Sequence, residues 1–405
     1  MKKIWIINHY AEPPDGGKYL RHYIFAKKLI QRGYDVTIFT ASTIHNTKIN
    51  HTDGHSPYQT QVVDDVPFVF IKTRNYFGNN GGRVGNMLDF YFGVRSVTRD
   101  FDCPDVIYTS GPHPLAWMAA RKAAKRCNAK YIVETRDLWP ETFIAMGRFG
   151  KRHPISQVLY RIEKSIYRDA DRLIFTFPGG AEYVKSIGLD PSKVRYVNNG
   201  IDFEDFRRLV HEVQYYDERF SDFKGFKAVF TGAIGRANAV DQIVKAAQLI
   251  QDKEESIRFY IFGYGTEEEA LKAYVEQQGI RNVIFMGRVK KDQIPSILEQ
   301  ADLNILTLDH LPGVFRYGLS PNKLFEYFAS GNPTISNVEC GYDLLEQYGS
   351  GKTVEGDPEH LAEGILTFSR LTEEEKAAYR EKAFSAAHAF DFETLTDQLV
   401  EVIEK

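Results

Sequence analysis

The sequence predicts an α/β protein built from two doubly wound, Rossmann-like domains. A chain of 405 residues is too long for one ordinary core. Short runs rich in Ile, Val, Phe, Tyr and Thr alternate with helix-length segments, which is typical of buried parallel strands joined by helices. The alternation restarts after residues 199–206. We therefore expect one domain over residues 1–202 and another over 203–384, with a C-terminal helix at about 385–405 that is free to pack back onto the first.

The first domain is expected to contain seven buried strands, because seven apolar runs are each bounded by turn residues. They cover residues 3–8, 34–42, 67–73, 105–110, 130–137, 172–177 and 194–200. A helix is expected over residues 18–33, where an apolar stripe ends at Gly33. Residues 45–65 have no apolar period, so we predict a mobile loop there.

The second domain repeats this pattern with five further apolar runs, each followed by a helical segment. The expected strands cover residues 227–232, 256–263, 282–287, 302–308 and 332–338. The expected helices cover residues 239–252, 267–279, 294–301 and 322–331. Both domains are therefore predicted to present strand ends and helix starts along one edge of a parallel sheet, where ligands of such folds bind.

Composition and charge restrict the class of protein. An apolar fraction of 43% with 13% aromatic residues excludes a disordered chain. Cys103, Cys127 and Cys340 lie far apart in the sequence, so we predict buried thiols in a reducing compartment and no zinc site. The first apolar run is too short for a signal peptide, and no run approaches the roughly 20 residues of a membrane helix. These features predict a cytosolic protein.

The charge is distributed unevenly along the chain. Residues 1–200 hold 29 Lys and Arg against 18 Asp and Glu, whereas the remaining residues hold 22 against 36. A basic half favours a phosphorylated substrate or an anionic membrane surface. Residues 72–99 mix aromatic and cationic side chains, which also suits a membrane interface on the inner face of the cell membrane. The alternative is that the aromatic side chains fill the core and the arginines are solvated.

Polar residues follow the strands of the first domain. The loop after the first strand ends in Gly16, Gly17 and Lys18, and glycine lets a backbone approach a ligand closely, although ordinary turns use glycine too. Arg136, Asp137 and Glu141 follow another strand and could bind a hydroxyl or phosphate, with an internal ion pair as the alternative. His113 also follows a strand, where a single histidine is more often a helix cap or a core residue.

The second domain carries three glycine-bearing turns and one helix start. The turns contain Gly235 with Arg236, Gly263 with Gly265, and Gly287 with Arg288 and Val289. At the helix start, Ser320 is expected to be the cap and Pro321 to lie in the first turn, followed by Asn322 and Lys323. Glu326 then lies inside the helix beside Phe325 and Phe328. A carboxylate in such company needs a partner, and ribose hydroxyls would serve.

With these residues in place, nearly the whole chain resembles the GT-B glycosyltransferases of family 4. The resemblance rests on the paired-glycine loop, the turn at 199–202, the glycines at 263–265 and the segment 320–335. Together with residues 136–141, it is greatest for the bacterial branch that builds O-antigen and capsule units, including N-acetylfucosaminyl transferases. It implies two domains that face a cleft, with the acceptor bound by the first and the nucleotide-sugar donor by the second.

The resemblance also implies sugar transfer from a UDP-sugar with retention of configuration and without a metal or other cofactor. The acceptor would be a glycan or a polyprenyl-diphosphate-linked sugar, and nucleic acid is not an expected partner. We expect Arg136, Asp137 and Glu141 to be catalytic, and His113 and Lys18 to face the acceptor. The expected donor-binding residues are Gly16, Gly17, Arg236, Gly265, Arg288, Val289, Ser320, Asn322, Lys323 and Glu326.

The sequence departs from the family pattern at several positions. Glu326 corresponds to the second acid of the family's E-x7-E motif, but Gly318 occupies the place of the first. The family's Arg and Lys for the diphosphate would fall near Ala233 and Asn238, so Arg236 and Lys323 are the expected substitutes. Arg136 replaces a common histidine.

The sequence is also compatible with three alternative functions. A UDP-sugar 2-epimerase shares the fold and the donor, and a non-catalytic partner subunit would tolerate the loss of the acid at Gly318. A two-lobed solute-binding protein would require export, for which the sequence has no signal.

Overall fold

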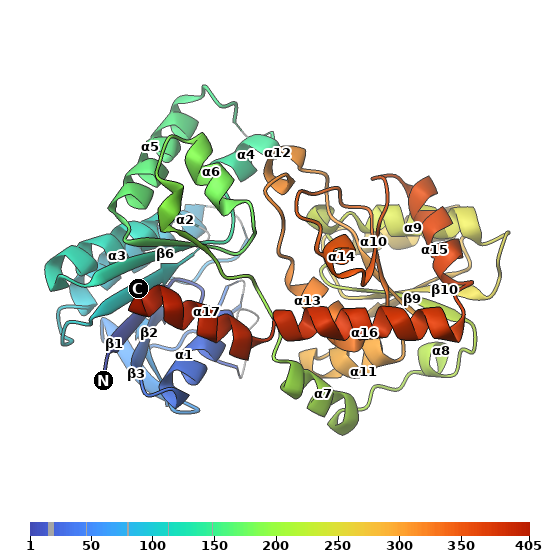
Figure 1. Cartoon of the computed structure of the whole chain (residues 1–405), viewed down its shortest axis with the longest axis horizontal. Helices are drawn as coiled ribbons and strands as arrows, with labels where there is room; N and C mark the ends of the chain where they lie inside the picture. The colour runs from blue at the N-terminus through green and yellow to red at the C-terminus, as the bar shows by residue number, and fades with distance from the viewer. Residues whose placement is uncertain (15–19, 46, 79–80, 112, 148) are drawn as a thin grey trace. The chain divides into compact units, whose positions relative to one another are not determined.

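The computed structural model describes residues 1–14, 20–45, 47–78, 81–111, 113–147 and 149–405 (Figure 1). The chain forms two compact units. Unit 1 comprises Met1–Asn198 and Leu395–Lys405, and unit 2 comprises Asn199–Thr394. The first division lies a few residues before the predicted boundary at 202, because the turn that begins at Asn199 packs with unit 2.

Unit 1 is built on an eight-stranded sheet of order β3-β4-β2-β1-β5-β6-β7-β8. Every neighbouring pair is parallel except β3 and β4. The strands are β1 (Lys3–Asn8), β2 (Asp35–Ala41), β3 (Tyr58–Val63), β4 (Val66–Ile71), β5 (Val106–Ser110), β6 (Lys130–Thr135), β7 (Arg172–Phe175) and β8 (Val194–Tyr196). All seven predicted strands are confirmed.

The prediction of a structureless loop over residues 45–65 was wrong at its end. Tyr58–Val63 forms the antiparallel edge strand β3, paired residue by residue with β4. The strand was missed because its middle residues are polar and exposed, so it lacks the apolar run of a buried strand. A polar strand at a sheet edge also protects the edge from pairing with another chain.

Helices cover both faces of the unit 1 sheet. They are α1 (Arg21–Gln31), α2 (Gly81–Val97), α3 (Pro114–Cys127), α4 (Glu141–Ala145), α5 (Pro154–Asp169), α6 (Gly180–Ser186) and the C-terminal α17 (Phe392–Glu404). Helix α3 lies between α2 and α5. From Leu395 onward, α17 belongs to unit 1, where Glu404 pairs with Lys2 at 2.6 Å and Asp397 with Arg32 at 2.8 Å.

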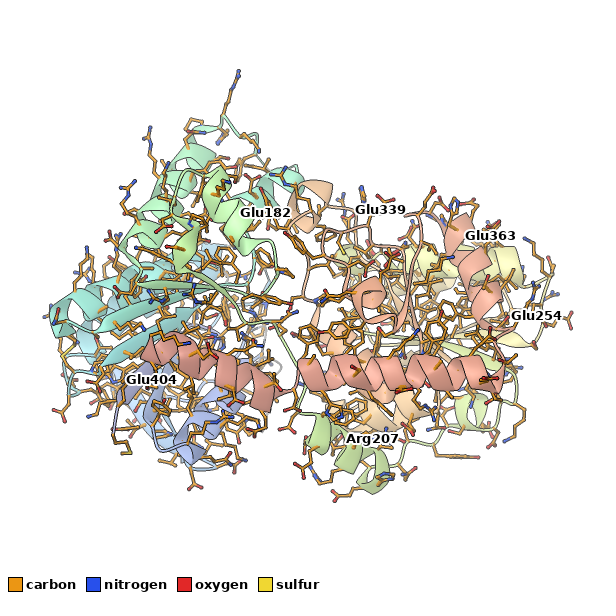
Figure 2. The ribbon with its side chains drawn as sticks, viewed as in Figure 1. Glu182, Arg207, Glu254, Glu339, Glu363 and Glu404 are labelled. Carbon is orange, nitrogen blue, oxygen red and sulfur yellow. A yellow bond between two sulfur atoms is a disulfide. The ribbon has the colours of Figure 1, made fainter. Side chains whose placement is uncertain are left out.

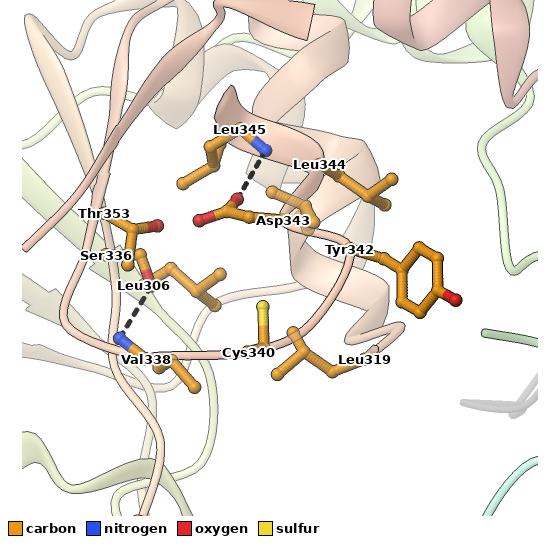
Figure 3. Close-up of a pocket in the computed structure, with 11 residues that line it drawn as sticks. Leu306, Leu319, Ser336, Val338, Cys340, Tyr342, Asp343, Leu344, Leu345 and Thr353 are labelled. Atoms are coloured by element: carbon orange, nitrogen blue, oxygen red, sulfur yellow. Dashed lines mark hydrogen bonds between the residues drawn. The ribbon is translucent and has the colours of Figure 1, made fainter. Parts of the chain in front are cut away.

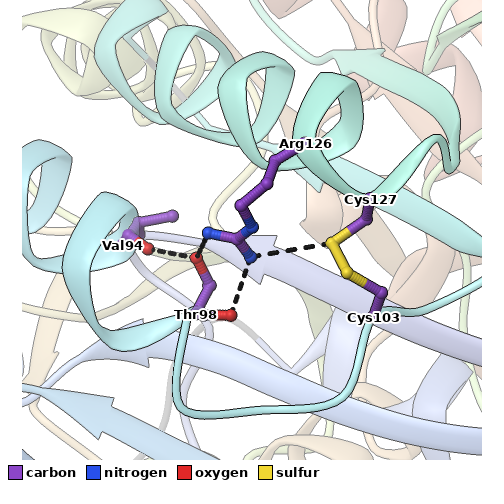
Figure 4. Close-up of a disulfide and its surroundings, with 5 residues drawn as sticks. All are labelled: Val94, Thr98, Cys103, Arg126 and Cys127. Carbon is purple, nitrogen blue, oxygen red and sulfur yellow. Dashed lines mark hydrogen bonds between the residues drawn. A yellow bond between two sulfur atoms is a disulfide. The ribbon is translucent and has the colours of Figure 1, made fainter.

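The prediction of three free thiols was also wrong. Cys103 and Cys127 form a disulfide, and only Cys340 is a free cysteine among the described residues (Figure 4). Cys103 precedes β5 and Cys127 ends α3, and a helix that crosses back over a parallel sheet returns to the start of its strand. The 24-residue separation hides this proximity in the sequence. Arg126 adds a hydrogen bond from Nη2 to the carbonyl of Thr98 at 2.7 Å.

Unit 2 is built on a six-stranded parallel sheet of order β11-β10-β9-β12-β13-β14. The strands are β9 (Phe226–Thr231), β10 (Ile257–Phe262), β11 (Val283–Gly287), β12 (Leu303–Leu306), β13 (Thr334–Ser336) and β14 (Gly351–Thr353). The five predicted strands are confirmed. The strand β14 is an addition, since its three residues, Gly-Lys-Thr, carry no apolar run.

The helices of unit 2 cover both faces of its sheet. They are α7 (Phe203–Glu212), α8 (Glu218–Ser221), α9 (Val240–Ile250), α10 (Glu268–Gln277), α11 (Ile294–Glu299), α12 (Pro312–Phe315), α13 (Asn322–Ser330), α14 (Leu344–Tyr348), α15 (Pro358–Phe368) and α16 (Glu373–Ala389). Apolar side chains of β9, β10, α9 and α15 form a continuous core. At the periphery, Arg207 of α7, which is labelled in Figure 2, pairs with Glu299 of α11 at 2.7 Å.

Each sheet has one point at which the strand order reverses. In unit 1 it lies between β1 and β5, and in unit 2 between β9 and β12. Ligands of open α/β sheets bind beyond the carboxyl ends of the strands at such switch points. No helix among the described residues is long and apolar enough to cross a membrane.

Candidate functional site

In unit 2, the loops that follow β9 and β12 are joined at the switch point. The Thr307 hydroxyl donates to the carbonyl of Asn238 at 2.7 Å, and the backbone N–H of Asp309 donates to the carbonyl of Ala237 at 3.0 Å. These bonds hold the short 3-10 helix η2 (Arg236–Asn238) against the next loop. The switch point therefore has a defined wall rather than two independent loops.

The glycines of the neighbouring turn allow two loop backbones to pack closely. A Cβ at Gly263 would lie 1.7 Å from the carbonyl oxygen of Gly232, and one at Gly265 would lie 2.1 Å from that of Ile234. The backbone N–H of Ile234 donates to the carbonyl of Tyr264 at 3.0 Å. No side chain fits at either glycine, so packing alone explains Gly265. Its contact with a donor stays a prediction.

Lys323, in the first turn of α13, extends into this wall. Its Nζ donates to Asn238 Oδ1 at 2.8 Å and lies 4.2 Å from the centre of the Phe230 ring. Burial lowers the pKa of Lys323 to about 7, against the raising effect of Glu326. The family's lysine was expected near Asn238. Here Asn238 instead holds an ammonium that comes from the opposite side of the switch point.

Glu326 lies one turn further along α13 and is half-buried. Its carboxylate has no hydrogen bond or ion pair with any residue that the structure describes. Burial raises the pKa of Glu326, while Lys291 and Lys323 oppose this effect. Phe325 and Phe328 are fully buried beside it, as predicted. The carboxylate of Glu326 thus offers two partly desolvated hydrogen-bond acceptors at the switch point. The buried apolar side chains of α13 hold the helix in place and so fix the position of this carboxylate.

The start of α13 differs from the prediction by one residue. Pro321 is the N-cap and Asn322 the first helical residue, so Ser320 does not cap the helix. Ser320 is instead joined to Asn199, whose side-chain Nδ2 donates to the Ser320 carbonyl at 2.8 Å. The error arose because a serine before proline is a common cap, whereas here Asn199, 121 residues away, binds the serine.

Gly318 has a structural reason to be glycine. Its φ of 95° lies in the left-handed region, which a side chain with a Cβ rarely adopts. The acid of the family motif would be strained at this position. The loop between α12 and α13 therefore has a backbone conformation that favours glycine at position 318. The family's acid could not be restored there without a change in this backbone.

Arg236 and Arg288 are both exposed at the carboxyl edge of the sheet. Arg236 is 89% exposed and makes one ion pair, at 3.5 Å, with Asp309. The guanidinium of Arg288 lies 5.0 Å from the centre of the Tyr264 ring, and the next residue, Val289, is half-buried. Two guanidinium groups are thus available near the glycine-bearing turns, and only Arg288 is held by a ring.

A small cavity lies beside this edge, between β12, β13 and α14 (Figure 3). Its volume is about 10 Å³, which is room for roughly one water molecule. Leu306, Leu324 and Leu344 make its lining largely apolar, and Asp343 accepts the backbone N–H of Leu345 at 2.8 Å. It is too small for a nucleotide.

In unit 1, a buried ion pair occupies the corresponding edge. The carboxylate of Glu134, in β6, accepts hydrogen bonds from Arg21 Nε at 3.0 Å, from the hydroxyl of Tyr108 and from Ser110 Oγ at 2.7 Å, and His22 Nε2 lies 3.1 Å away. Burial alone would raise the pKa of Glu134, but Arg21 and His22 hold it well below its usual range. This pair joins Glu134 to Arg21, so it is not the internal ion pair of Arg136 that the sequence left open as an alternative, which stays a prediction.

His113 is the N-cap residue of α3 and only 2% exposed. Its Nε2 bonds to His9 Nδ1 at 2.6 Å, and His9 Nε2 bonds to Asn86 Oδ1 at 2.6 Å. Burial lowers the pKa of His9 to about 3, and burial together with His9 lowers that of His113 well below its usual value. This neutral pair joins the loops after β1 and β5, so the structure gives His113 a positioning role, and its contact with an acceptor stays a prediction.

The three expected catalytic residues lie after β6, where desolvation of its carboxyl group raises the pKa of Asp137 and Arg136 opposes this effect. Arg136 is half-buried and Asp137 is exposed. Glu141, at the start of α4, accepts the Tyr160 hydroxyl at 2.7 Å and lies 3.6 Å from Lys151. Glu141 is therefore already paired within unit 1. Gly16, Gly17 and Lys18 lie outside the described residues.

Comparison with known families identifies the two halves of the chain. Residues 17–200 match the family described as glycosyl transferase 4-like domain, and residues 225–370 match glycosyl transferases group 1. The chain is a GT-B glycosyltransferase. Both matched segments agree with the two Rossmann-like units, so the predicted fold class and enzyme class are confirmed.

Curated relatives of this chain are named as glycosyltransferases, and one of the names refers to colanic acid biosynthesis. The chain is 24% identical over 219 residues to the probable glycosyltransferase WbjE of Pseudomonas aeruginosa, covering 53% of this chain and 52% of that protein. It is 20% identical over 267 residues to the putative colanic acid biosynthesis glycosyl transferase WcaI of Escherichia coli, covering 60% and 59%. The matches span little more than half the length of these relatives.

Solved structures share the fold over the whole chain. Sucrose-phosphate synthase from Thermosynechococcus elongatus superposes with a TM-score of 0.76 at 14% identity, covering 100% of this chain and 98% of that one. HepE of Anabaena in complex with UDP superposes with a TM-score of 0.70 at 15% identity, covering 100% of both chains. At these identities the likeness establishes the fold.

Proposed function

We propose that the chain transfers a sugar from a UDP-sugar to a glycan or a polyprenyl-diphosphate-linked acceptor in the synthesis of a bacterial surface polysaccharide. The reaction would retain the anomeric configuration and need no metal. The observation that carries the proposal is the arrangement on α13, where the unpaired carboxylate of Glu326 and the ammonium of Lys323 lie together at the switch point of unit 2.

The chemistry of a nucleotide diphosphate fits these groups. The two carboxylate oxygens of Glu326 can accept hydrogen bonds from the two ribose hydroxyls, which supplies the partner that burial of an acid requires. Lys323, Arg236 and the N-terminal end of α13 can stabilise the negative charge that develops on the leaving diphosphate. The names of WcaI and of the UDP complex of HepE support the pathway and the nucleotide.

On the acceptor side, we propose that Arg136 and Asp137 orient the attacking hydroxyl. Positioning of this kind contributes to the rate by presenting the oxygen to the anomeric carbon. Asp137→Asn should lower kcat at least tenfold and leave UDP affinity within about twofold. Full activity of Asp137→Asn would remove this role. Glu141→Gln is the comparison, since Glu141 already binds Tyr160 and its loss should act first on stability.

The test of the proposed function is a thermal-shift screen of the whole chain against UDP, GDP, CMP and their sugars. A ligand selective for the folded state stabilises it by about 2.7 kcal/mol at 100 times its Kd. We expect a shift with UDP that Glu326→Ala abolishes. A shift with another nucleotide alone, or one that Glu326→Ala leaves unchanged, would contradict the proposal.

Product analysis separates the alternatives. With a UDP-sugar and a mixture of lipid-linked acceptors, a transferase forms UDP only when an acceptor is present, and NMR of the product reports its anomeric configuration. A 2-epimerase would convert the UDP-sugar without an acceptor. Tight UDP binding with no turnover on any acceptor would favour a non-catalytic partner subunit, an alternative that rests on Gly318 in place of the family's acid.

We also propose a cytosolic location at the inner face of the membrane, where such donors and acceptors are available. The disulfide between Cys103 and Cys127 is unusual for a reducing compartment. Thiol labelling in lysates prepared under acid quench therefore tests the location directly. Labelling of both cysteines agrees with the cytosol, whereas complete protection until a reductant is added would place the chain elsewhere.

A further inference from the structure

Helix α2 of unit 1 is apolar on two opposite faces. Its inner face, with Phe90, Val94 and Val97, is buried against the sheet. On the outer face, Val84, Leu88 and Phe92 follow one another at intervals of four residues, and they are 56%, 40% and 58% exposed. Residues four apart lie on one line of a helix. A helix on the surface of a globular protein normally carries polar side chains there.

This outer line, Val84–Leu88–Phe92, is flanked by cations, and a further exposed aromatic residue precedes the helix. Phe77, four residues before α2, is 52% exposed. Beside the line, the half-buried Tyr91 contacts two cations, the guanidinium of Arg95 at 5.4 Å and the ammonium of Lys122 of α3 at 6.0 Å. The cations are therefore held close to the apolar line.

No acid of α2 offsets these cations. Asp89 is the only acid between residues 81 and 97, and it is paired with Arg74 through Nε at 2.7 Å and Nη2 at 2.8 Å. Arg99, which follows the helix, is exposed. The outer face of α2 thus combines an apolar, aromatic line with cations that no acid of the helix itself offsets, and it belongs to the half of the sequence with an excess of Lys and Arg.

We propose that this face, which we call the α2 surface, docks onto an anionic lipid bilayer. Apolar and aromatic side chains would enter the boundary between headgroups and acyl chains, and Arg95, Arg99 and Lys122 would bind the acidic headgroups. A second copy of the chain is disfavoured, because a twofold contact would place the same cations against each other. Docking is independent of sugar transfer. Its use, to bring unit 1 to a lipid-linked acceptor, rests on the proposed function.

The test is co-sedimentation of the whole protein with vesicles of phosphatidylglycerol and phosphatidylcholine mixed, and of phosphatidylcholine alone. We expect binding only with phosphatidylglycerol, and weaker binding at 0.5 M than at 0.1 M salt, because salt screens charge. Leu88→Ser with Phe92→Ser should weaken binding at least tenfold. Arg95→Gln with Lys122→Gln should weaken it about fivefold for each cation removed.

Leu249→Ser is the matched control, since Leu249 is 37% exposed on a helix of unit 2 and outside the proposed surface. It should bind vesicles like the unchanged protein. Each variant is also tested for UDP-induced thermal stabilisation, which reports the folding and the donor site separately from docking. Loss of that shift in all proteins would contradict the proposed function and leave docking untouched.

Two results would overturn the docking proposal. One is vesicle binding that is equal in the unchanged protein and in the Leu88→Ser, Phe92→Ser variant. The other is absence of binding to phosphatidylglycerol vesicles at either salt concentration. In the second case, a dimer in size-exclusion chromatography that Phe92→Ser dissociates would assign the α2 surface to a second copy of the chain.

Discussion

At the carboxyl edges of the two sheets, the charged side chains are paired to very different degrees. In unit 1, Glu134 is fully buried and surrounded by Arg21, His22 and two hydroxyl groups. In unit 2, Glu326 has no partner among the described residues, and Lys323 is bound only by a neutral amide and a ring. The first arrangement is complete without a ligand, whereas the second is complete only with one. A buried charge is therefore evidence for a site only when its partners are missing.

The largest effect is expected where the charge is already satisfied. Arg21→Met leaves the carboxylate of Glu134 buried without its main cation, and breaking such a pair costs about 3–5 kcal/mol. Chemical denaturation should show this loss in the free energy of unfolding. Arg208→Met is the control, because Arg208 is 51% exposed in its ion pairs and should change stability by less than about 1 kcal/mol. Equal effects of the two changes would show that the unit 1 pair is not structural.

The next largest effect concerns ligand binding and leaves folding intact. Glu326→Gln should weaken UDP binding about 10- to 100-fold, since two charge-assisted hydrogen bonds to ribose become neutral ones. The folded state should be at least as stable, because an acid that is costly to bury has become an amide. Calorimetric titration and thermal denaturation measure the two quantities. Glu363→Gln, an exposed change on α15, should alter neither. If Glu326→Gln destabilised the protein and left the UDP affinity unchanged, Glu326 would serve the fold, as Glu134 does in unit 1.

The two edges also differ in how far the sequence predicts them. Lys323 and Glu326 are three residues apart on one helix, so the segment alone places them on neighbouring turns. Glu134 and Arg21 are 113 residues apart, and only the folded sheet brings them together. Local pattern predicted the apolar parallel strands for the same reason, since burial on both faces leaves a continuous apolar run. The polar edge strand β3 and the link between Asn199 and Ser320 depend on tertiary contacts that no local pattern encodes.

A third prediction uses the pKa of Lys323. Burial lowers it from 10.5 to about 7, so above pH 7 the folded protein increasingly holds a neutral amine. UDP binding requires the ammonium, and its affinity should therefore fall as pH rises above 7, by a factor approaching ten per unit. In the absence of ligand, the stability of the fold depends on pH in the opposite direction. The unfolded chain binds more protons than the folded one between about pH 7 and 10.5, so the free energy of unfolding rises with pH in this range.

Lys323→Arg separates this effect from the titration of UDP itself, because arginine keeps its charge throughout. Calorimetric titrations from pH 6.5 to 9 should give a steeper loss of affinity for the unchanged protein than for Lys323→Arg. Parallel pH profiles would mean that Lys323 does not bind the diphosphate. The comparison of the two edges would then rest on Glu326 alone.

The smallest effect is expected at Arg236, which is 89% exposed and makes one long ion pair. A solvated guanidinium loses little when it is removed from the free protein, so Arg236→Gln should change the free energy of unfolding by less than about 0.5 kcal/mol. It should weaken UDP binding about threefold at low salt, and less at 0.5 M salt, because an exposed charge is screened. Arg288→Gln is the comparison variant. The guanidinium of Arg288 already lies over Tyr264 in the free protein, so it loses less conformational freedom when UDP binds. If Arg236→Gln weakens UDP binding as much as Glu326→Gln does, the exposed Arg236 side chain must become ordered around the diphosphate. The open edge of unit 2 would then be organised by ligand binding and not already organised in the free protein.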